Sequence, residues 1–421
     1  MNVNSKLYKI VVYGFIPLWT FEDLIIMLFD VNLNKYIGLP LTILSVLFAI
    51  SYMINYKDEE TTTTKIVKFF FIYNVVSVIW FLFSDVPIVG YIENLKYFIC
   101  PLAFYFFGCT DANFSSKFYT TFGLSVFFIL FLGLIWYIAP PGFYIDYIIR
   151  MKQSSYYLSG TEYLNEANIM NYAALESFVG LYTTSLLCIP LMAISFGLLF
   201  SNQRTYHPIL LYLSVIIAFV GAILTFQRIS IFGAIVCFLF FAIYGCIKRN
   251  NRIAVIGVLT ILVVVYVGAI YYVSRFDTIS QSMDSTLETF TFSSAMNDRT
   301  GQFDIALAQW DNILLGSGLG SASGYARSIG RIGVTDGEYV RILIETGIFG
   351  FIMFVFIIGS SIWQVIKRVD IFVIEIVVVV FFLGACVGAN ALSKGTMIAP
   401  IFWFCLGRIN NIKLINSQNS I

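Results

Sequence analysis

Charged side chains are scarce in this 421-residue chain, where Lys, Arg, Asp and Glu together make only 12% of the residues. Soluble domains carry about 25% charged residues, so about half of the usual charge is missing. The formal net charge of +1 provides no basic field that would attract nucleic acid. Hydrophobic residues, in contrast, make 59% of the chain. This composition excludes a cytosolic enzyme, a nucleic-acid binder and a disordered chain, and it predicts a polytopic membrane protein.

Residues that bind metal ions are equally scarce. His207 is the single histidine, whereas zinc sites usually combine several Cys or His ligands at defined spacing. The seven cysteines all lie in apolar runs or at their edges, and none falls in a long polar stretch. We therefore expect no metal site and no disulfide framework, and we interpret the cysteines as small apolar residues.

Long apolar runs fill most of the chain. A membrane-spanning helix needs about 20 mostly apolar residues. Twelve runs approach that length, at about 8–28, 35–54, 66–83, 95–110, 119–138, 177–200, 208–226, 231–247, 253–273, 341–361, 371–390 and 396–409. The first run lacks a small-residue cleavage site and is expected to stay as an anchor. The predicted fold class is an all-α polytopic membrane protein with about twelve transmembrane helices, in which residues 1–421 form a single integral membrane domain.

Two polar stretches, at about 140–176 and 274–340, interrupt this pattern. When the N-terminus is placed in the cytoplasm, Lys and Arg gather in the cytoplasmic connections, as at Lys248, Arg249 and Arg252. The positive-inside rule then places both termini in the cytoplasm and both long loops outside. Irregular backbone that meets water and lipid headgroups is where function concentrates. We therefore expect a functional site in these two loops.

Two arginines stand on this outer side. Arg228 lies in a tight turn between two apolar runs, where its charge opposes the positive-inside bias and is costly near hydrocarbon. Arg299 follows Asp298, an N-cap candidate, and opens a segment whose apolar residues at 303–310 share one helical face. Guanidinium groups bind phosphate bidentately, so both arginines are candidates for binding a lipid-linked phosphate. The alternatives are a snorkelling Arg228 and a solvated Arg299.

A Gly-Ser stretch follows at 315–324 and reads L-G-S-G-L-G-S-A-S-G. It matches neither the dinucleotide-binding fingerprint nor a P-loop with its lysine. A nucleotide cofactor is therefore not predicted. We expect either a flexible lid or a close approach of backbone to substrate, because glycine permits both.

Carboxylates precede and enter the tenth predicted span. Asp336 and Glu338 stand at its membrane mouth, where a carboxylate can act as a general base. Glu345 lies four residues after Arg341, so the two are placed to pair on a helix, which is the structural use of both. Glu375 lies inside another predicted span and is interpreted as a polar group used in packing.

Three features, taken in order, resemble the O-antigen polymerase and ligase superfamily. They are Arg299 before an amphipathic segment that ends in Trp310, then the Gly-Ser stretch, and then the sequence D-G-E-Y-V-R-I-L-I-E-T-G-I-F-G from Asp336. The resemblance covers about residues 297–351, with Arg228 and the overall layout in support. It implies a multi-span glycosyltransferase of the bacterial inner membrane that handles undecaprenyl-pyrophosphate-linked oligosaccharides on the periplasmic side. No metal, cofactor or nucleotide sugar is implied, and the partners are membrane lipids and, by extension, a chain-length regulator protein.

Related ligases carry a histidine at the place of Asp336, so this departure favours an O-antigen polymerase over a ligase. In the polymerase interpretation, Arg228 and Arg299 bind the pyrophosphate. Asp336 and Glu338 are catalytic, and Arg341 and Glu345 support them.

Three alternatives stay open. A flippase of lipid-linked oligosaccharides is expected to have short loops, internal repeats and charged residues along a central cavity. This chain has long outer loops, no fixed-period repeat and few charges deep in its apolar runs, which favours an enzyme. An O-antigen ligase and a capsule polysaccharide polymerase are closer alternatives, and the sequence does not identify the sugars or the linkage.

Overall fold

The computed structural model describes residues 3–29, 34–55, 60–82, 88–110, 112–145, 175, 181–200, 207–225, 227–249, 312–323, 337–388, 391–392 and 398–416. Within these ranges the regular structure is helical and contains no strand, as the sequence predicts. Eleven of the twelve predicted apolar runs lie on these helices. The run at 253–273 lies outside the described residues.

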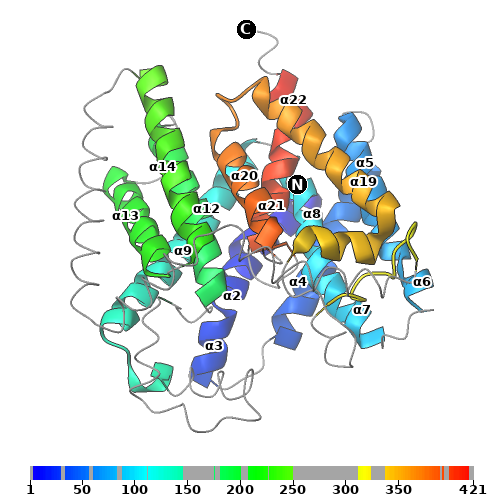
Figure 1. Ribbon diagram of the computed structural model, residues 1–421, viewed down its shortest axis with the longest axis horizontal. Helices are drawn as coiled ribbons and strands as arrows, with labels where there is room; N and C mark the ends of the chain where they lie inside the picture. Colours follow the sequence, from blue (N-terminus) through cyan, green and yellow to red (C-terminus); the bar gives the residue numbers. More distant parts are fainter. Residues whose placement is uncertain are drawn as a thin grey trace, which may run out of the picture. The chain divides into compact units, whose positions relative to one another are not determined.

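The chain divides into two compact units (Figure 1). The first unit contains α1 (Val3–Lys9), η1 (Ile10–Phe15), α2 (Ile16–Thr20), α4 (Asn34–Asn55), α5 (Thr62–Val76), α6 (Val78–Phe81), α7 (Ile88–Asn94), η2 (Leu95–Ile99), α8 (Cys100–Gly108), α19 (Glu338–Ile366), α20 (Val373–Gly388), α21 (Ile398–Ile409) and α22 (Ile412–Asn416). The second contains α3 (Glu22–Phe29), most of α9 (Ala112–Ile138), α12 (Leu181–Phe200), α13 (Pro208–Leu224) and α14 (Arg228–Arg249).

Five helical segments are long and apolar enough to cross a membrane, counting only the residues that the structure describes. They are Thr62–Phe81, Ser116–Ile138, Thr183–Phe200, Arg228–Gly245 and Glu338–Ile366. Four shorter apolar helices accompany them, at Leu39–Asn55, Pro208–Leu224, Val373–Val387 and Ile398–Ile409. The chain is therefore an all-helical membrane protein, whereas the total of twelve spans and the side on which each loop lies stay predictions.

Two helical irregularities have the same local cause. The π-helices η1 and η2 each end two residues before a proline, Pro17 and Pro101. Proline has no N–H group and clashes with the carbonyl four residues earlier, which lies inside the π-helical turn in both cases. The wider turn removes that clash without ending the helix.

The centre of the first unit is the crossing of α8 and α21. All nine residues of α8 are buried, and so is every residue of α21 except Arg408. The two backbones meet at Gly108 and Gly407, where a Cβ on either residue would overlap main-chain atoms of the other helix. Small residues of this kind allow membrane helices to approach closely. The close contact positions α21 for the packing of α19 and α20 against it.

A buried ion pair joins α20 and α21 in this core, and Tyr119 of α9 bonds to it. Arg408 Nε of α21 donates to Glu375 Oε1 of α20 at 2.6 Å, and Tyr119 OH of α9 donates to the same oxygen at 2.7 Å. The guanidinium also lies over the Tyr119 ring, 5.7 Å from its centroid. Glu375 is thus the packing polar group that the sequence predicts. Its contacts with Arg408 and Tyr119 offset the energetic cost of burying its carboxylate.

In the second unit α12 packs against both α13 and α14. Ser230 Oγ at the start of α14 donates to the Ser185 carbonyl of α12 at 2.9 Å. The Leu175 N–H donates to the Leu224 carbonyl at 2.7 Å, and both leucines are buried. The end of the first long loop is therefore fixed at the C-terminus of α13, close in sequence to Arg228.

We predict that Gly407→Ala destabilises the protein by about 1–3 kcal/mol, because an added methyl group must push two helix backbones apart. Gly359→Ala in α19 is the matched control, since nothing lies within 4 Å of its added Cβ. The control is expected to be neutral or to stabilise by up to about 1 kcal/mol through helix propensity. Thermal unfolding of both variants in detergent measures this, and equal melting temperatures would contradict the crossing.

Candidate functional site

Helix α19 is broken at Gly347, where φ is 67° and ψ is −179°. Figure 1 shows its two segments running in different directions. The span predicted at 341–361 lies within the candidate span Glu338–Ile366, but the sequence analysis did not predict the break inside it. A helix would bond the N–H groups of residues 348 and 349 to the carbonyls of residues 344 and 345. The break separates these four main-chain groups, which must then find other partners in an apolar environment.

The Gly-Ser stretch supplies those partners. The N–H groups of Ser317 and Gly318 donate to the Ile344 and Glu345 carbonyls at 2.9 and 3.0 Å. In return, the N–H groups of residues 348 and 349 donate to the carbonyls of residues 313 and 314 at 2.9 and 3.2 Å. Every main-chain group freed at these two helical bonds is therefore satisfied. The segment 312–318 acts as a backbone insert in the broken helix.

Glycine is required where the two backbones touch. Gly316 and Gly347 both have positive φ, and a Cβ on either would overlap main-chain atoms of the other segment. The Gly-Ser stretch thus closely approaches the backbone of α19, whereas the predicted approach to a substrate stays a prediction. Residues 316–323 are all buried.

Tyr73 of α5 fastens this junction from a third side. Its hydroxyl lies 2.8 Å from both the Leu315 carbonyl and the Thr346 carbonyl, so it bridges the insert and the last residue before the break. The side chain is buried. A single hydroxyl group thereby links α5 to both backbone segments that meet at the break.

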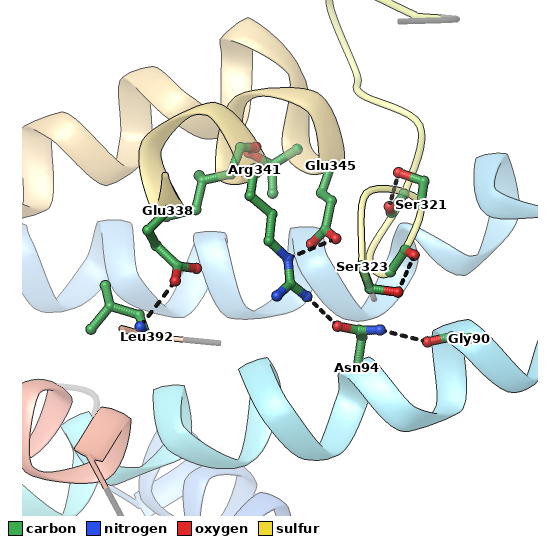
Figure 2. A network of polar contacts seen from close by, with 12 residues as sticks. Gly90, Asn94, Ser321, Ser323, Glu338, Arg341, Glu345 and Leu392 are labelled. Carbon is green, nitrogen blue, oxygen red and sulfur yellow. Dashed lines mark hydrogen bonds and ion pairs between the residues drawn. The ribbon is translucent and has the colours of Figure 1, made fainter. Parts of the chain in front are cut away.

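A polar ring closes around the same segment (Figure 2). Arg341 Nε donates to Glu345 Oε1 at 3.0 Å, and Arg341 Nη2 donates to Asn94 Oδ1 of α7. The main-chain carbonyl of Glu345 accepts the Gly318 N–H of the Gly-Ser stretch at 3.0 Å. Arg341 and Glu345 are 5% and 2% exposed, so their charges compensate each other out of contact with bulk water. The i, i+4 pairing predicted from the sequence is confirmed, and it anchors the Gly-Ser stretch.

Glu338 points away from that ring, as Figure 2 shows. It is the first residue of α19, fully buried, and its Oε2 accepts the Leu392 N–H at 3.0 Å. Tyr339 OH next to it donates to the Leu383 carbonyl at 2.7 Å. Gly337, with φ of 119°, gives the chain its entry into the helix. Glu338 thus fixes the connection after α20 to the start of α19.

Arg228 lies in the second unit, where it is the first residue of α14 and half-buried. It lies between two apolar helices as predicted, but at the start of α14 and not in the turn that precedes that helix. The first turn of α14 contains no acidic residue. The helix dipole places partial positive charge at this end, so a cation there is disfavoured by about 0.3–1 kcal/mol. Arg299 and Asp336, the other two predicted site residues, lie outside the described residues.

The comparison with known proteins agrees with this region. Residues 213–355 match the family described as O-Antigen ligase. The matched segment contains every site residue predicted from the sequence, the Gly-Ser stretch and the break in α19. The resemblance to the O-antigen polymerase and ligase superfamily is confirmed on this segment, which forms an O-antigen ligase-like domain of a membrane protein. No curated protein matches the chain.

Two residues of the site were not predicted, Tyr73 and Asn94. Both lie far ahead of the matched segment. Tyr73 is one of 26 tyrosines and stands inside an apolar run, where it resembles an ordinary packing residue. Asn94 precedes an apolar run and resembles a loop residue. Among the described residues, no group of three or more His, Cys, Asp or Glu is placed to hold a metal ion.

We predict that Glu345→Leu destabilises the protein by about 3–5 kcal/mol, because it leaves the Arg341 charge buried without its counterion. The double variant Arg341→Met/Glu345→Leu removes both charges and is expected to cost less than Glu345→Leu alone. Melting temperatures of the two single variants and the double variant form a double-mutant cycle. Strictly additive losses would show that the pair is not coupled.

Proposed function

We propose that the protein is an O-antigen polymerase, a glycosyltransferase that joins undecaprenyl-pyrophosphate-linked repeat units on the periplasmic face of the inner membrane. The observation that carries this proposal is the match to the O-antigen ligase family combined with Asp336 at the place where related ligases carry histidine. A ligase is the second candidate, because the matching family is described by that activity.

In the proposed reaction, a hydroxyl group of one lipid-linked repeat unit attacks the anomeric carbon of a second lipid-linked glycan. A glycosidic C–O bond forms, and the bond between that carbon and the pyrophosphate oxygen breaks. The hydroxyl proton passes to the Asp336 carboxylate, and the undecaprenyl pyrophosphate leaves with the bonding electrons. Arg228 and Arg299 stabilise the charge that develops on the leaving oxygens, an electrostatic contribution that needs no metal ion.

The surroundings of the two acidic residues support a division of roles. Glu338 is fully buried and its carboxylate binds the Leu392 N–H, which suits a residue that shapes the site. Asp336 directly precedes Gly337, the residue of positive φ at the entry to α19, and is our candidate for the base.

The deciding experiment is the length distribution of lipid-linked glycans in cells that lack the protein. A polymerase leaves single lipid-linked repeat units, a ligase leaves long lipid-linked chains that are not transferred, and a flippase leaves no periplasmic material. We expect single units. Arg228→Ala and Arg299→Ala are expected to lower the rate roughly ten- to a hundred-fold, the loss of one charge-assisted contact, and Arg→Lys is expected to rescue only partly.

Arg368→Ala at the end of α19 is the matched control for the arginine variants. Its guanidinium bonds Gln364 at 2.8 Å and is partly exposed, like that of Arg228. It should leave chain length unchanged. Long chains at normal abundance in Arg228→Ala would remove that residue from the proposed site.

For the acidic pair, we predict that Asp336→Asn loses far more activity than Glu338→Gln. A general base contributes about 10² to 10⁴ in rate, and the amide removes basicity at nearly constant volume while keeping the turn preference of the Asp-Gly dipeptide. Gln at position 338 keeps an oxygen that accepts the Leu392 N–H. Glycan ladders from both variants, normalised to protein level, measure the difference. Chains of normal length from Asp336→Asn would rule out the base.

A further inference from the structure

Asn94 lies at an unusual point of the first unit. It is the last residue of α7, and the π-helix η2 begins directly after it. Such π-helical turns are rare and are found frequently at functional sites. Asn94 is 2% exposed and lies outside the segment that matches the family. Nothing in the matched motifs assigns it a role.

Both ends of the Asn94 amide are engaged. Its Oδ1 accepts a hydrogen bond from Arg341 Nη2, and its Nδ2 donates to the Gly90 carbonyl at 2.7 Å (Figure 2). These two contacts fix the orientation of the amide group. They also explain why the residue is an amide, because an aspartate would turn an oxygen toward the Gly90 carbonyl and add a second negative charge beside Glu345.

The Gly-Ser stretch lies directly on this amide. A Cβ on Gly320 would lie 2.6 Å from the Gly90 carbonyl oxygen and 2.7 Å from Asn94 Nδ2. The Gly318 N–H of the stretch bonds the Glu345 main-chain carbonyl, the Glu345 carboxylate bonds Arg341, and Arg341 bonds Asn94. The contacts therefore form a closed ring that joins α7, α19 and the Gly-Ser stretch. Asn94 is the member of the ring that comes from outside the matched segment.

The ring involves the described residues on either side of the segment 324–336, which contains Asp336 and lies outside the described residues. On one side, the Gly-Ser stretch is described up to Ser323. On the other side, Gly337 accepts the Arg341 N–H at 3.1 Å through its carbonyl, at the start of α19. Arg341 is therefore linked to both sides, through Glu345 to the Gly-Ser stretch and through its own main chain to Gly337.

We propose that Asn94 is a positioning residue for the glycosyl-transfer site. It holds the Arg341 guanidinium and, through it, the Gly-Ser stretch and the start of α19, which are the described residues on either side of Asp336 in the sequence. This inference rests on the proposed function for its catalytic consequence, whereas the positioning itself is a property of the fold. The two parts have separate tests.

The variants are Asn94→Leu, which removes both hydrogen bonds at similar volume, and Asn74→Leu as a matched control. Asn74 is also a fully buried helical asparagine of this unit, and its Nδ2 donates to the carbonyl four residues earlier, Phe70, at 2.8 Å. Its Oδ1 has no hydrogen-bond partner, in contrast to that of Asn94. The two variants therefore differ in the contact with Arg341.

The first test is amide hydrogen exchange of the full-length protein in detergent. We expect the N–H groups of residues 317–323 to exchange about tenfold faster or more in Asn94→Leu, the order expected for losing a hydrogen bond to a charged group. Asn74→Leu should exchange like the wild type. In an Arg341→Met background, Asn94→Leu should add nothing further. Unchanged exchange in Asn94→Leu, or an additive effect in the double variant, overturns the positioning role.

The second test is elongation of lipid-linked repeat units extracted from cells that lack the protein. We expect Asn94→Leu to lower kcat at least about tenfold and to change KM less than twofold. The reason is that the variant misplaces the groups of the site while substrate affinity is kept. A wild-type kcat in Asn94→Leu contradicts the inference. If the wild type does not elongate repeat units but Asn94→Leu still speeds the exchange of residues 317–323, the proposed function is wrong. The positioning of the Gly-Ser stretch by Asn94 then still holds.

Asn94→Asp covers the case in which Asn94→Leu does not fold. It keeps an acceptor for Arg341 and loses the donor to Gly90. We expect exchange of residues 317–323 closer to the wild type than in Arg341→Met, and partial retention of kcat. Exchange as fast as in Arg341→Met would contradict a role that acts through the Arg341 contact.

Discussion

The break in α19 at Gly347 is the constraint on which this site depends. In an apolar environment, each main-chain group that leaves a helix must be bonded elsewhere. Four such groups around Gly347 are bonded by the segment 312–318, and the Tyr73 hydroxyl bonds a carbonyl on each side. The Gly-Ser stretch is therefore held by backbone chemistry, and its sequence is glycine-rich because side chains would collide where the two backbones meet.

The polar ring follows from that arrangement. The Gly-Ser stretch is bonded to the main chain of α19 at Glu345, and Arg341 compensates the buried carboxylate of that residue. Buried charge pairs contribute little net stability but are costly to break, so they suit a site in which geometry matters more than stability. Of the two acidic residues, Glu338 accepts the Leu392 N–H inside the fold, whereas Asp336, the proposed base, lies outside the described residues.

Local features were predictable from the sequence, and long-range ones were not. Eleven apolar runs lie on helices because hydropathy is a local property, and the Arg341–Glu345 pair follows from helical spacing. The glycines predicted a close approach of backbone. The break at Gly347 was missed because a single glycine is tolerated within a helix. Asn94, Tyr73 and the partners of Glu375 lie far from their contacts along the chain, so only helix packing identifies them.

The most direct test of the account uses the purified protein in proteoliposomes with lipid-linked repeat units, in the presence and absence of the lipid A–core acceptor that a ligase requires. The account predicts that repeat units are joined into longer lipid-linked chains without that acceptor, and that the product lengths are multiples of one unit. Transfer that occurs only when the acceptor is present, with no growth of the lipid-linked chains, would contradict it and identify a ligase.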